Sequence, residues 1–156
     1  MSTINYINMI GMNLNREWFF VLGVIIIFLT LDLRTKEWAE KNLNISKHLF
    51  RGKIQLIYVR NYGIAFNRLS GKKNLILIIN LFLFTYLGYL LYTDINNYLA
   101  YSLILAGGLG NFIGRIQKGY VIDFIYFNIQ GWPVFNIADF EVLLGISIVM
   151  VREIIG

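Results

Sequence analysis

The sequence contains no cysteine and a single histidine, His48. Without cysteine the chain can form no disulfide, no thiolate metal site and no cysteine nucleophile. One histidine has no second histidine with which to share a metal, so zinc chemistry and histidine-based triads lack their parts. No Lys-Ser or Lys-Thr follows the glycines, which excludes a phosphate-binding loop of the usual pattern. Carboxylates therefore remain the natural candidates for chemistry.

Charged residues are also scarce, at 15% of the 156 residues, whereas hydrophobic residues make up 57%. Soluble domains carry about a quarter charged residues on average, so this composition indicates an integral membrane protein about the size of one domain. The net charge is +5, but the cations lie between apolar blocks and form no basic face. We therefore expect anionic lipid headgroups as their counterpart, and not nucleic acid.

Apolar runs divide the chain into four predicted membrane spans with two long loops. A span needs roughly 20 residues, so the shorter runs must extend into neighbouring polar residues. The last uncharged run covers only residues 142–151, and the fourth span must include Asp139 to cross. The spans are predicted at about 17–36, 74–92, 98–116 and 134–153, and the loops at 37–73 and 117–133.

The loop 37–73 is expected to lie outside the hydrocarbon. Residues 37–50 mix apolar side chains with lysines, which favours an amphipathic stretch along the interface. Residues 54–59 are rich in β-branched side chains and precede NYGIAF at 61–66, which predicts a small strand pair or cradle. The strand-like run YVIDFIYF at 120–127 lies in the second loop.

The polar residues near the span ends all fall on one side of the membrane. Four spans place both termini on one side and both long loops on the other. Asp32 and Lys36 end the first span four residues apart, where they can form an ion pair. An ionisable residue at membrane depth is a functional hypothesis by default. The other residues that this count places at the loop side are Asn61, Asn111, Arg115, Asp123, Asn136 and Asp139.

Asp123 and Asp139 are the strongest catalytic candidates. Two carboxylates that share a small, partly dehydrated site hold one proton between them. The ionised carboxylate can take a proton from water while the protonated one donates to a carbonyl oxygen. Arg115 can keep one carboxylate charged, and asparagine amides can hold the substrate backbone or orient the carboxylates.

The residues alone leave other interpretations open. Asp123 fits a solvated loop, and Asp139 fits the start of a helix, where the dipole favours a carboxylate. An ion-coupled transporter that uses the same carboxylates is the main functional alternative to a peptidase. An assembly subunit, in which neither carboxylate is needed, is a third.

Four motifs that follow one another over most of the chain resemble those of the lipoprotein signal peptidases, the type II signal peptidases of bacteria. The resemblance implies a metal-independent aspartic endopeptidase without a cofactor, in the bacterial cytoplasmic (inner) membrane. Such enzymes cut prolipoproteins just before a diacylglyceryl-modified cysteine. The motifs are Asp-x-x-Thr-Lys at 32–36, Asn-x-Gly-x-Ala-Phe at 61–66, GGLGNFIGRIQKGYVIDF at 107–124 and Phe-Asn-x-Ala-Asp-x-x-Val at 135–142.

The resemblance also implies a fold and residue roles. The expected fold is mainly α, with four transmembrane helices, a small extracytoplasmic β-cradle and an amphipathic interfacial helix. Asp123 and Asp139 would form the catalytic dyad, with Asp32 and Lys36 as a structural pair. Expected partners are prolipoproteins and membrane lipids, the protein is expected to be a monomer, and globomycin-type antibiotics are expected to block it. Residues implied to bind substrate or support the site are Asn61, Gly63, Asn111, Arg115, Asn136 and Ala138.

Two positions depart from the family pattern. Gly114 stands where the family commonly has Asp, which removes a possible partner of Arg115, and Leu33 stands where Gln is common. Orientation is a second conflict, because the lysines and arginines of the first loop would place the loops in the cytoplasm by the positive-inside rule. The resemblance implies cytoplasmic termini and a site near the outer face. We expect the orientation that the resemblance implies, because the lipid-modified substrate is presented at the outer leaflet.

Overall fold

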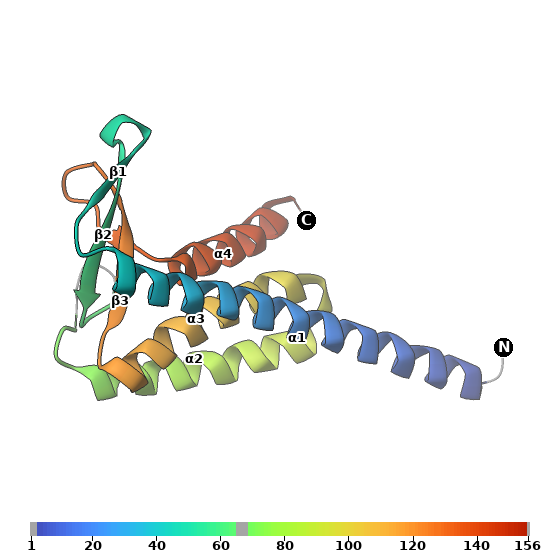
Figure 1. Ribbon diagram of the computed structural model, residues 1–156. Helices are drawn as coiled ribbons and strands as arrows, with labels where there is room; N and C mark the ends of the chain where they lie inside the picture. The colour runs from blue at the N-terminus through green and yellow to red at the C-terminus, as the bar shows by residue number, and fades with distance from the viewer. Residues whose placement is uncertain (1–2, 65–68, 156) are drawn as a thin grey trace.

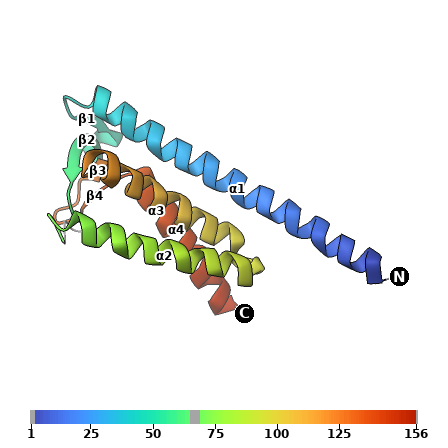
Figure 2. The ribbon, with the colours of Figure 1, turned by 90° about the horizontal axis from the view of Figure 1, so that it is seen from below.

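A bundle of helices carries a small sheet at one end in the computed structural model, which describes residues 3–64 and 69–155 (Figure 1). Residues Ala65 and Phe66 of the NYGIAF motif lie outside the described residues. The view turned by 90° shows the same arrangement, with the sheet at one end and the first part of α1 projecting beyond the other (Figure 2). The helices are α1 (Thr3–Asn42), α2 (Lys73–Thr93), α3 (Tyr98–Lys118) and α4 (Ile137–Ile155).

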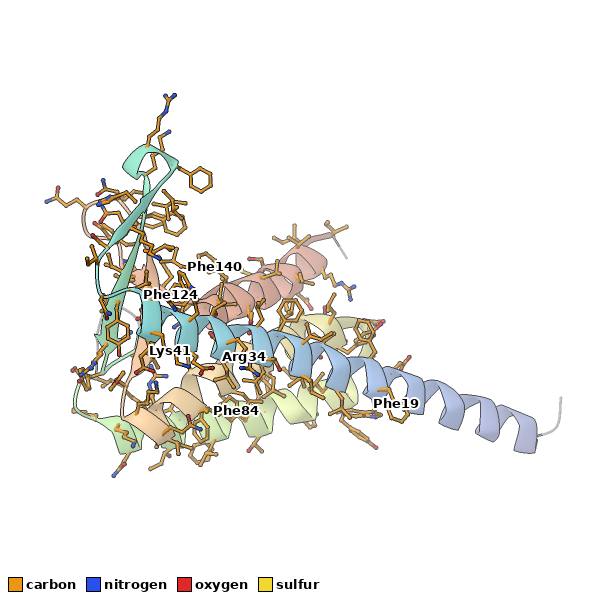
Figure 3. The ribbon with its side chains drawn as sticks, viewed as in Figure 1. Phe19, Arg34, Lys41, Phe84, Phe124 and Phe140 are labelled. Carbon is orange, nitrogen blue, oxygen red and sulfur yellow. The ribbon has the colours of Figure 1, made fainter. Side chains whose placement is uncertain are left out.

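Helix α3 lies against each of the other helices, and glycines allow one of these contacts to be close. A Cβ on Gly107 would collide with the carbonyl oxygen of Ala138 in α4. A Cβ on Gly145 of α4 would lie 2.6 Å from the carbonyl oxygen of Ala100 in α3. Small residues permit such close approach of helices in lipid. The outer surface is apolar, and Phe19 of α1 is 75% exposed (Figure 3).

Three helical segments are long and apolar enough to cross a membrane, namely Glu17–Asn42, Lys73–Thr93 and Tyr98–Lys118. They contain the first three predicted spans. Helix α4 overlaps most of the fourth predicted span, but it carries too many acidic and basic residues to count as a membrane span by composition alone. Its crossing of the membrane therefore stays a prediction.

Helix α1 continues past residue 36, the predicted end of the first span, to Asn42. Ala39 and Leu43 explain the extension, because they lie four residues apart and pack against Ile122 and Phe124 of the sheet. The amphipathic interfacial helix is not confirmed, because residues 37–42 belong to α1 and residues 47–49 form a strand.

The sheet has four antiparallel strands in the order β1-β2-β3-β4. Strand β2 pairs with β3 so that Val59 is opposite Asp123 and Asn61 is opposite Val121. The predicted cradle strand at 54–59 and the strand-like run in the second loop are both confirmed. Because β3 packs on the end of α1, it holds Asp123 beside the ends of the helices. The strands are β1 (Lys47–Leu49), β2 (Ile54–Asn61), β3 (Val121–Phe127) and β4 (Val134–Phe135), with a short 3-10 turn η1 (Phe50–Gly52) between the first two.

Candidate active site

Asp139 lies in the first turn of α4, where the cap of the helix fixes its carboxylate. The Oδ1 atom of Asn136, just before the helix, accepts a hydrogen bond from the backbone N–H of Asp139 at 3.0 Å. In return, the backbone N–H of Asn136 donates to Oδ2 of Asp139 at 3.1 Å. This reciprocal pair is the arrangement of a capping box. One carboxylate oxygen is thereby held by the chain itself, and the other accepts from Nδ2 of Asn111 at 3.0 Å.

Asp123 lies in the middle of β3 and is only 3% exposed. Its Oδ1 accepts from Nδ2 of Asn136 at 2.6 Å, and its Oδ2 accepts from Nδ2 of Asn61 at 2.9 Å. Burial raises the pKa of Asp123 to about 6, and the charge of Asp139 acts in the same direction, while the two amide hydrogen bonds oppose the rise. The interpretation of Asp123 as a solvated loop residue is wrong, because strand pairing and burial remove it from water.

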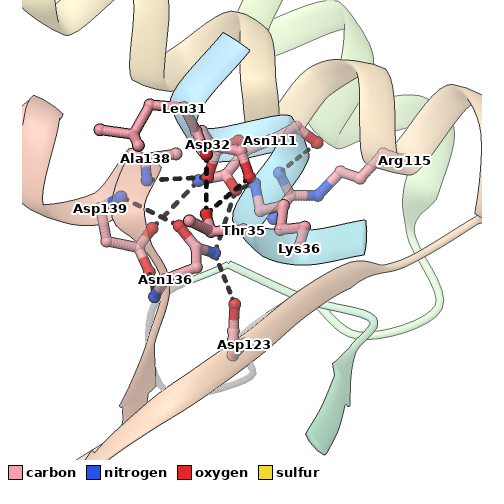
Figure 4. Close-up of polar contacts among 10 residues, drawn as sticks. All are labelled: Leu31, Asp32, Thr35, Lys36, Asn111, Arg115, Asp123, Asn136, Ala138 and Asp139. Atoms are coloured by element: carbon pink, nitrogen blue, oxygen red, sulfur yellow. Dashed lines mark hydrogen bonds and ion pairs between the residues drawn. The ribbon is translucent and has the colours of Figure 1, made fainter. Parts of the chain in front are cut away.

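Two asparagines connect the two carboxylates (Figure 4). Asn136 donates to Asp123 through its side chain and caps Asp139 through its backbone and side-chain oxygen. The Oδ1 atom of Asn111 accepts from Nδ2 of Asn136 at 3.2 Å and from Nζ of Lys36 at 2.8 Å. A set of amides therefore orients both carboxylates without neutralising them.

Asp32 and Lys36 form the predicted ion pair, with Nζ 2.7 Å from Oδ2. Asp32 is fully buried, and its Oδ1 accepts from the backbone N–H of Ala138 at 2.9 Å. That N–H belongs to the first turn of α4, where no partner exists within the helix. A Cβ on Gly110 of α3 would collide with Oδ2 of Asp32, so only glycine leaves room for the pair. The pair ties α1 to α3 and to the start of α4.

Arg115 is buried but donates to backbone oxygens. Its Nη2 donates to the carbonyl oxygen of Gly63 at 2.6 Å, and its Nη1 donates to that of Asn111 at 3.3 Å. The backbone N–H of Gly63 donates to Oδ1 of Asn61 at 2.9 Å, so Arg115 holds the turn that positions Asn61. Within the described residues, 3–64 and 69–155, no ion pair joins Arg115 to Asp123 or Asp139.

The site brings together every residue predicted for it, from all parts of the bundle that meet the sheet. Asp32 and Lys36 come from α1, Asn111 and Arg115 from α3, and Asp123 from β3. The remaining members come from the end of β2 and the start of α4: Asn61, Gly63, Asn136, Ala138 and Asp139.

Sequence reasoning missed Glu141, which lies on α4 two residues beyond Asp139. Its side chain is 3% exposed, and neither carboxylate oxygen has a hydrogen-bond partner among the residues that the structure describes. The charges that interact electrostatically with the Glu141 carboxylate are those of Asp32 and Lys36. The signal was present in the sequence, because an acidic residue inside a predicted span is costly and calls for a functional explanation.

The arrangement of the two carboxylates is suited to acid–base hydrolysis. Two carboxylates, oriented by amides and largely removed from water, can hold one proton and exchange it with a water molecule and a carbonyl oxygen. Burial and the charge of Asp139 raise the pKa of Asp123, so this carboxyl holds a proton to higher pH than an exposed aspartate does. No three His, Cys, Asp or Glu side chains in the described part of the chain gather closely enough to hold a metal ion.

Comparisons with known proteins agree with this geometry. Residues 24–155 match the family model for signal peptidase (SPase) II. The chain is 38% identical over 132 residues to the lipoprotein signal peptidase of Caldicellulosiruptor bescii, a match that covers 83% of this chain and 84% of the relative. It is 34% identical to the lipoprotein signal peptidase of Buchnera aphidicola subsp. Schizaphis graminum, with 90% and 97% covered.

Solved structures are similar as well. A bacterial membrane enzyme determined by the in meso method at 2.3 Å resolution superimposes with a TM-score of 0.80 and 30% identity, covering 86% of this chain and 87% of the other. A bacterial membrane enzyme determined by the same method at 1.9 Å gives a TM-score of 0.77 and 30% identity, with 85% and 90% covered.

Proposed function

The chain belongs to the signal peptidase II family, whose members process prolipoproteins, and from that membership we propose that Asp123 and Asp139 are the catalytic dyad of an aspartic endopeptidase. The observation that carries this proposal is the set of hydrogen bonds from Asn136, which reaches both carboxylates at once. The substrate is a prolipoprotein, cut before a diacylglyceryl-modified cysteine.

In the proposed reaction one carboxylate of the dyad is ionised and the other holds a proton. The ionised group takes a proton from water as the water oxygen bonds to the carbonyl carbon of the scissile peptide, and the protonated group donates to the carbonyl oxygen. Protonation of the leaving nitrogen then breaks the C–N bond. The carboxylate that took the proton from water supplies this proton, while the other carboxylate takes back a proton from a hydroxyl of the tetrahedral intermediate as that hydroxyl becomes the carbonyl of the new carboxyl group. The pair is thereby left with a single proton again.

The supporting residues have positioning roles in this proposal. Asn61 and Asn136 orient Asp123, while Asn111 and the helix cap orient Asp139. Asp32 and Lys36 act one step further away, through Asn111 and the backbone of Ala138. These contacts hold reacting groups in place before substrate arrives, which lowers the cost of reorganisation during the reaction.

We also propose the membrane arrangement. Helix α4 is the fourth span, both termini are cytoplasmic, and the sheet with the site lies at the outer face of the cytoplasmic membrane, in a monomeric protein. The parity of four predicted spans and the gathering of polar side chains where the helices meet the sheet support it (Figure 4). A reporter active only outside the cytoplasm, inserted near Arg51, should be active; a silent but well-expressed fusion would refute the orientation.

The transporter alternative finds no support in the comparisons.

The direct test is cleavage of a diacylglyceryl-modified precursor by purified protein in lipid vesicles that contain a chelator. Asp123→Asn and Asp139→Asn should each lower the rate by about 10³-fold or more, because acid–base groups of this kind contribute about 10²- to 10⁴-fold. Glu37→Gln is the matched control, since it removes an exposed carboxylate on α1 and should cleave normally.

Thermal unfolding of each variant shows whether it has folded. Normal processing by either folded Asp variant would refute the proposal that Asp123 and Asp139 form the catalytic dyad. Loss of wild-type activity in chelator would contradict the metal-independent mechanism.

A further inference from the structure

The hairpin made of β1, η1 and β2 projects sideways from the bundle at the level where the helices end (Figure 1). It runs crosswise to the helices, and in the turned view it again lies at the end of the bundle that carries the site (Figure 2). If the helices cross the membrane, the hairpin lies along the membrane–water boundary. We call residues 45–53 the hairpin tip.

The hairpin tip exposes large apolar side chains. Within these nine residues Ile45 is 80% exposed, Phe50 is 73% exposed and Leu49 is 40% exposed. Apolar side chains gathered on a protrusion mark an interaction with a protein or a membrane. Their position at the boundary level favours the membrane.

The backbone of the hairpin tip is held in a costly conformation. Phe50 and Arg51 have positive φ angles of 49° and 58°, and Gly52 follows with 84°. Left-handed backbone at a residue other than glycine costs about 1–3 kcal/mol and is retained chiefly where it has a use. Here it puts a phenylalanine and an arginine, both exposed, at the end of the hairpin.

The charge of the hairpin tip has one sign. Lys47, Arg51 and Lys53 lie within it, and the sequence has no Asp or Glu from Lys41 to Thr93. The ammonium group of Lys47 also lies 5.4 Å from the centre of the Trp38 ring, a cation–aromatic pair. Cations beside exposed apolar and aromatic groups are complementary to anionic headgroups above acyl chains.

We propose that the hairpin tip docks into the outer leaflet, with Phe50 and its apolar neighbours among the acyl chains and Arg51 on the phosphate of an anionic phospholipid. This rests on the membrane arrangement proposed above. Strand β2 continues from the tip to Val59, opposite Asp123 in β3. Docking therefore sets the depth at which the site meets the lipid-modified part of its substrate.

The absence of cysteine makes a direct test possible, because one introduced cysteine takes a single spin label. His48→Cys places the label in β1, where the side chain is exposed, and leaves the apolar and cationic side chains of the tip intact. Asn96→Cys, in the turn between α2 and α3 at the other end of the bundle, is the water-exposed reference.

The labelled protein is placed in vesicles of phosphatidylcholine alone and in vesicles that also contain phosphatidylglycerol. Accessibility to oxygen and to a water-soluble nickel chelate reports the depth of the label. We expect the label at 48 to be protected from the chelate in the anionic vesicles and less protected in the neutral ones.

Arg51→Gln should lower the ratio of docked to undocked label by about fivefold in the anionic vesicles, because one cation near such a surface contributes about that much. Arg152→Gln, which removes the same charge at the opposite end of the bundle, should leave the ratio unchanged.

A label that is equally exposed to the chelate in both kinds of vesicle would overturn the proposal, as would equal depth in both. Spin–spin broadening between labels would overturn it too, since it would assign the tip to contact with a second copy of the chain. Cleavage by the unlabelled protein is measured alongside. If cleavage is retained while the tip is exposed to water, only this inference fails; loss of the dyad's role is read from the Asp variants alone.

Discussion

Two lysine–carboxylate pairs lie close together on α1 and have almost the same local geometry. Lys36 lies 2.7 Å from Asp32, and Lys41 lies 2.6 Å from Glu37, each at a spacing of four residues. Their surroundings differ completely. The side chains of Lys36 and Asp32 are 6% and 0% exposed, whereas those of Lys41 and Glu37 are 69% and 48% exposed.

The difference shows that distance alone does not tell what an ion pair is for. The exposed pair stays within α1 and, like most such pairs, contributes little to stability, because water and salt screen its charges. The buried pair also accepts a backbone hydrogen bond from Ala138 and donates to Asn111. It therefore fixes α3 and the start of α4 relative to α1, and through them it orients the carboxylates of the site.

Asp32→Ala should give the largest effect on stability. The change leaves the ammonium of Lys36 buried without its counter-charge and the N–H of Ala138 without its acceptor. Breaking a buried pair on one side costs about 3–5 kcal/mol. Thermal or denaturant unfolding in detergent measures the loss. A double variant, Asp32→Ala with Lys36→Met, should recover part of it, and a single variant as stable as the wild type would contradict the role given to the pair.

A pH series extends the comparison to the carboxylates themselves. Burial and the nearby charge of Asp139 raise the pKa of Asp123 from 3.8 to about 6. Between these values the folded protein holds a proton that the unfolded chain has released, so stability falls as pH rises through this window. The fall is at most about 3 kcal/mol. Unfolding midpoints at both ends of the window should therefore differ less in Asp123→Asn than in the wild type.

Asp94, at the end of α2, is the matched control for this series. Hydrogen bonds from Asn97 and Tyr101 lower the pKa of Asp94, so its contribution to stability is lost only as pH falls below its ordinary range. Asp94→Asn should shift the midpoint equally at both ends of the window used for Asp123. An unchanged pH dependence in Asp123→Asn would show that burial does not control this carboxylate.

Much of the helical fold and of the site was predictable, because both follow from patterns along the chain. Apolar runs predicted the helices, and the parity of four spans placed Asp32, Asn111 and Asp139 at one end. The short uncharged run at 142–151 also predicted that the fourth span includes Asp139 near its start, where the helix dipole favours a carboxylate.

The rest depends on contacts between distant segments. Arg115 was expected to keep a carboxylate charged, but its guanidinium donates to the carbonyl oxygens of Gly63 and Asn111. The bond to Gly63, which lies 52 positions away in the sequence, follows from no spacing along the chain. Helix α1 continues to Asn42 because Ala39 packs on the sheet, and the sheet forms only when β2 meets β3. Gly114, where the family commonly has Asp, lies close to backbone, since a Cβ would be 3.3 Å from the carbonyl oxygen of Tyr120.

Gly110→Ala should have an intermediate effect, because it tests the room around the buried pair without removing any charge. The added methyl would collide with Oδ2 of Asp32, which cannot move without losing Lys36. Overpacking of this kind costs about 1–3 kcal/mol. Gly88→Ala on α2 is the matched control, since its methyl would meet nothing within 4 Å. The control should be neutral or slightly stabilising, as alanine favours helix over glycine. Equal unfolding midpoints for both variants would show that a methyl group at position 110 fits beside Asp32 and Lys36 without displacing them.

Glu37→Gln should have the smallest effect on the unfolding midpoint, because water replaces the lost contact with Lys41. Salt separates the two pairs further, since mobile ions screen exposed charges and reach buried ones far less. Raising the salt concentration should therefore bring Glu37→Gln to the stability of the wild type, while the deficit of Asp32→Ala persists. The measurement is the unfolding midpoint of both variants and the wild type at low and high salt. A salt-insensitive loss in Glu37→Gln as large as that in Asp32→Ala would mean that burial does not set the difference between the two pairs on α1.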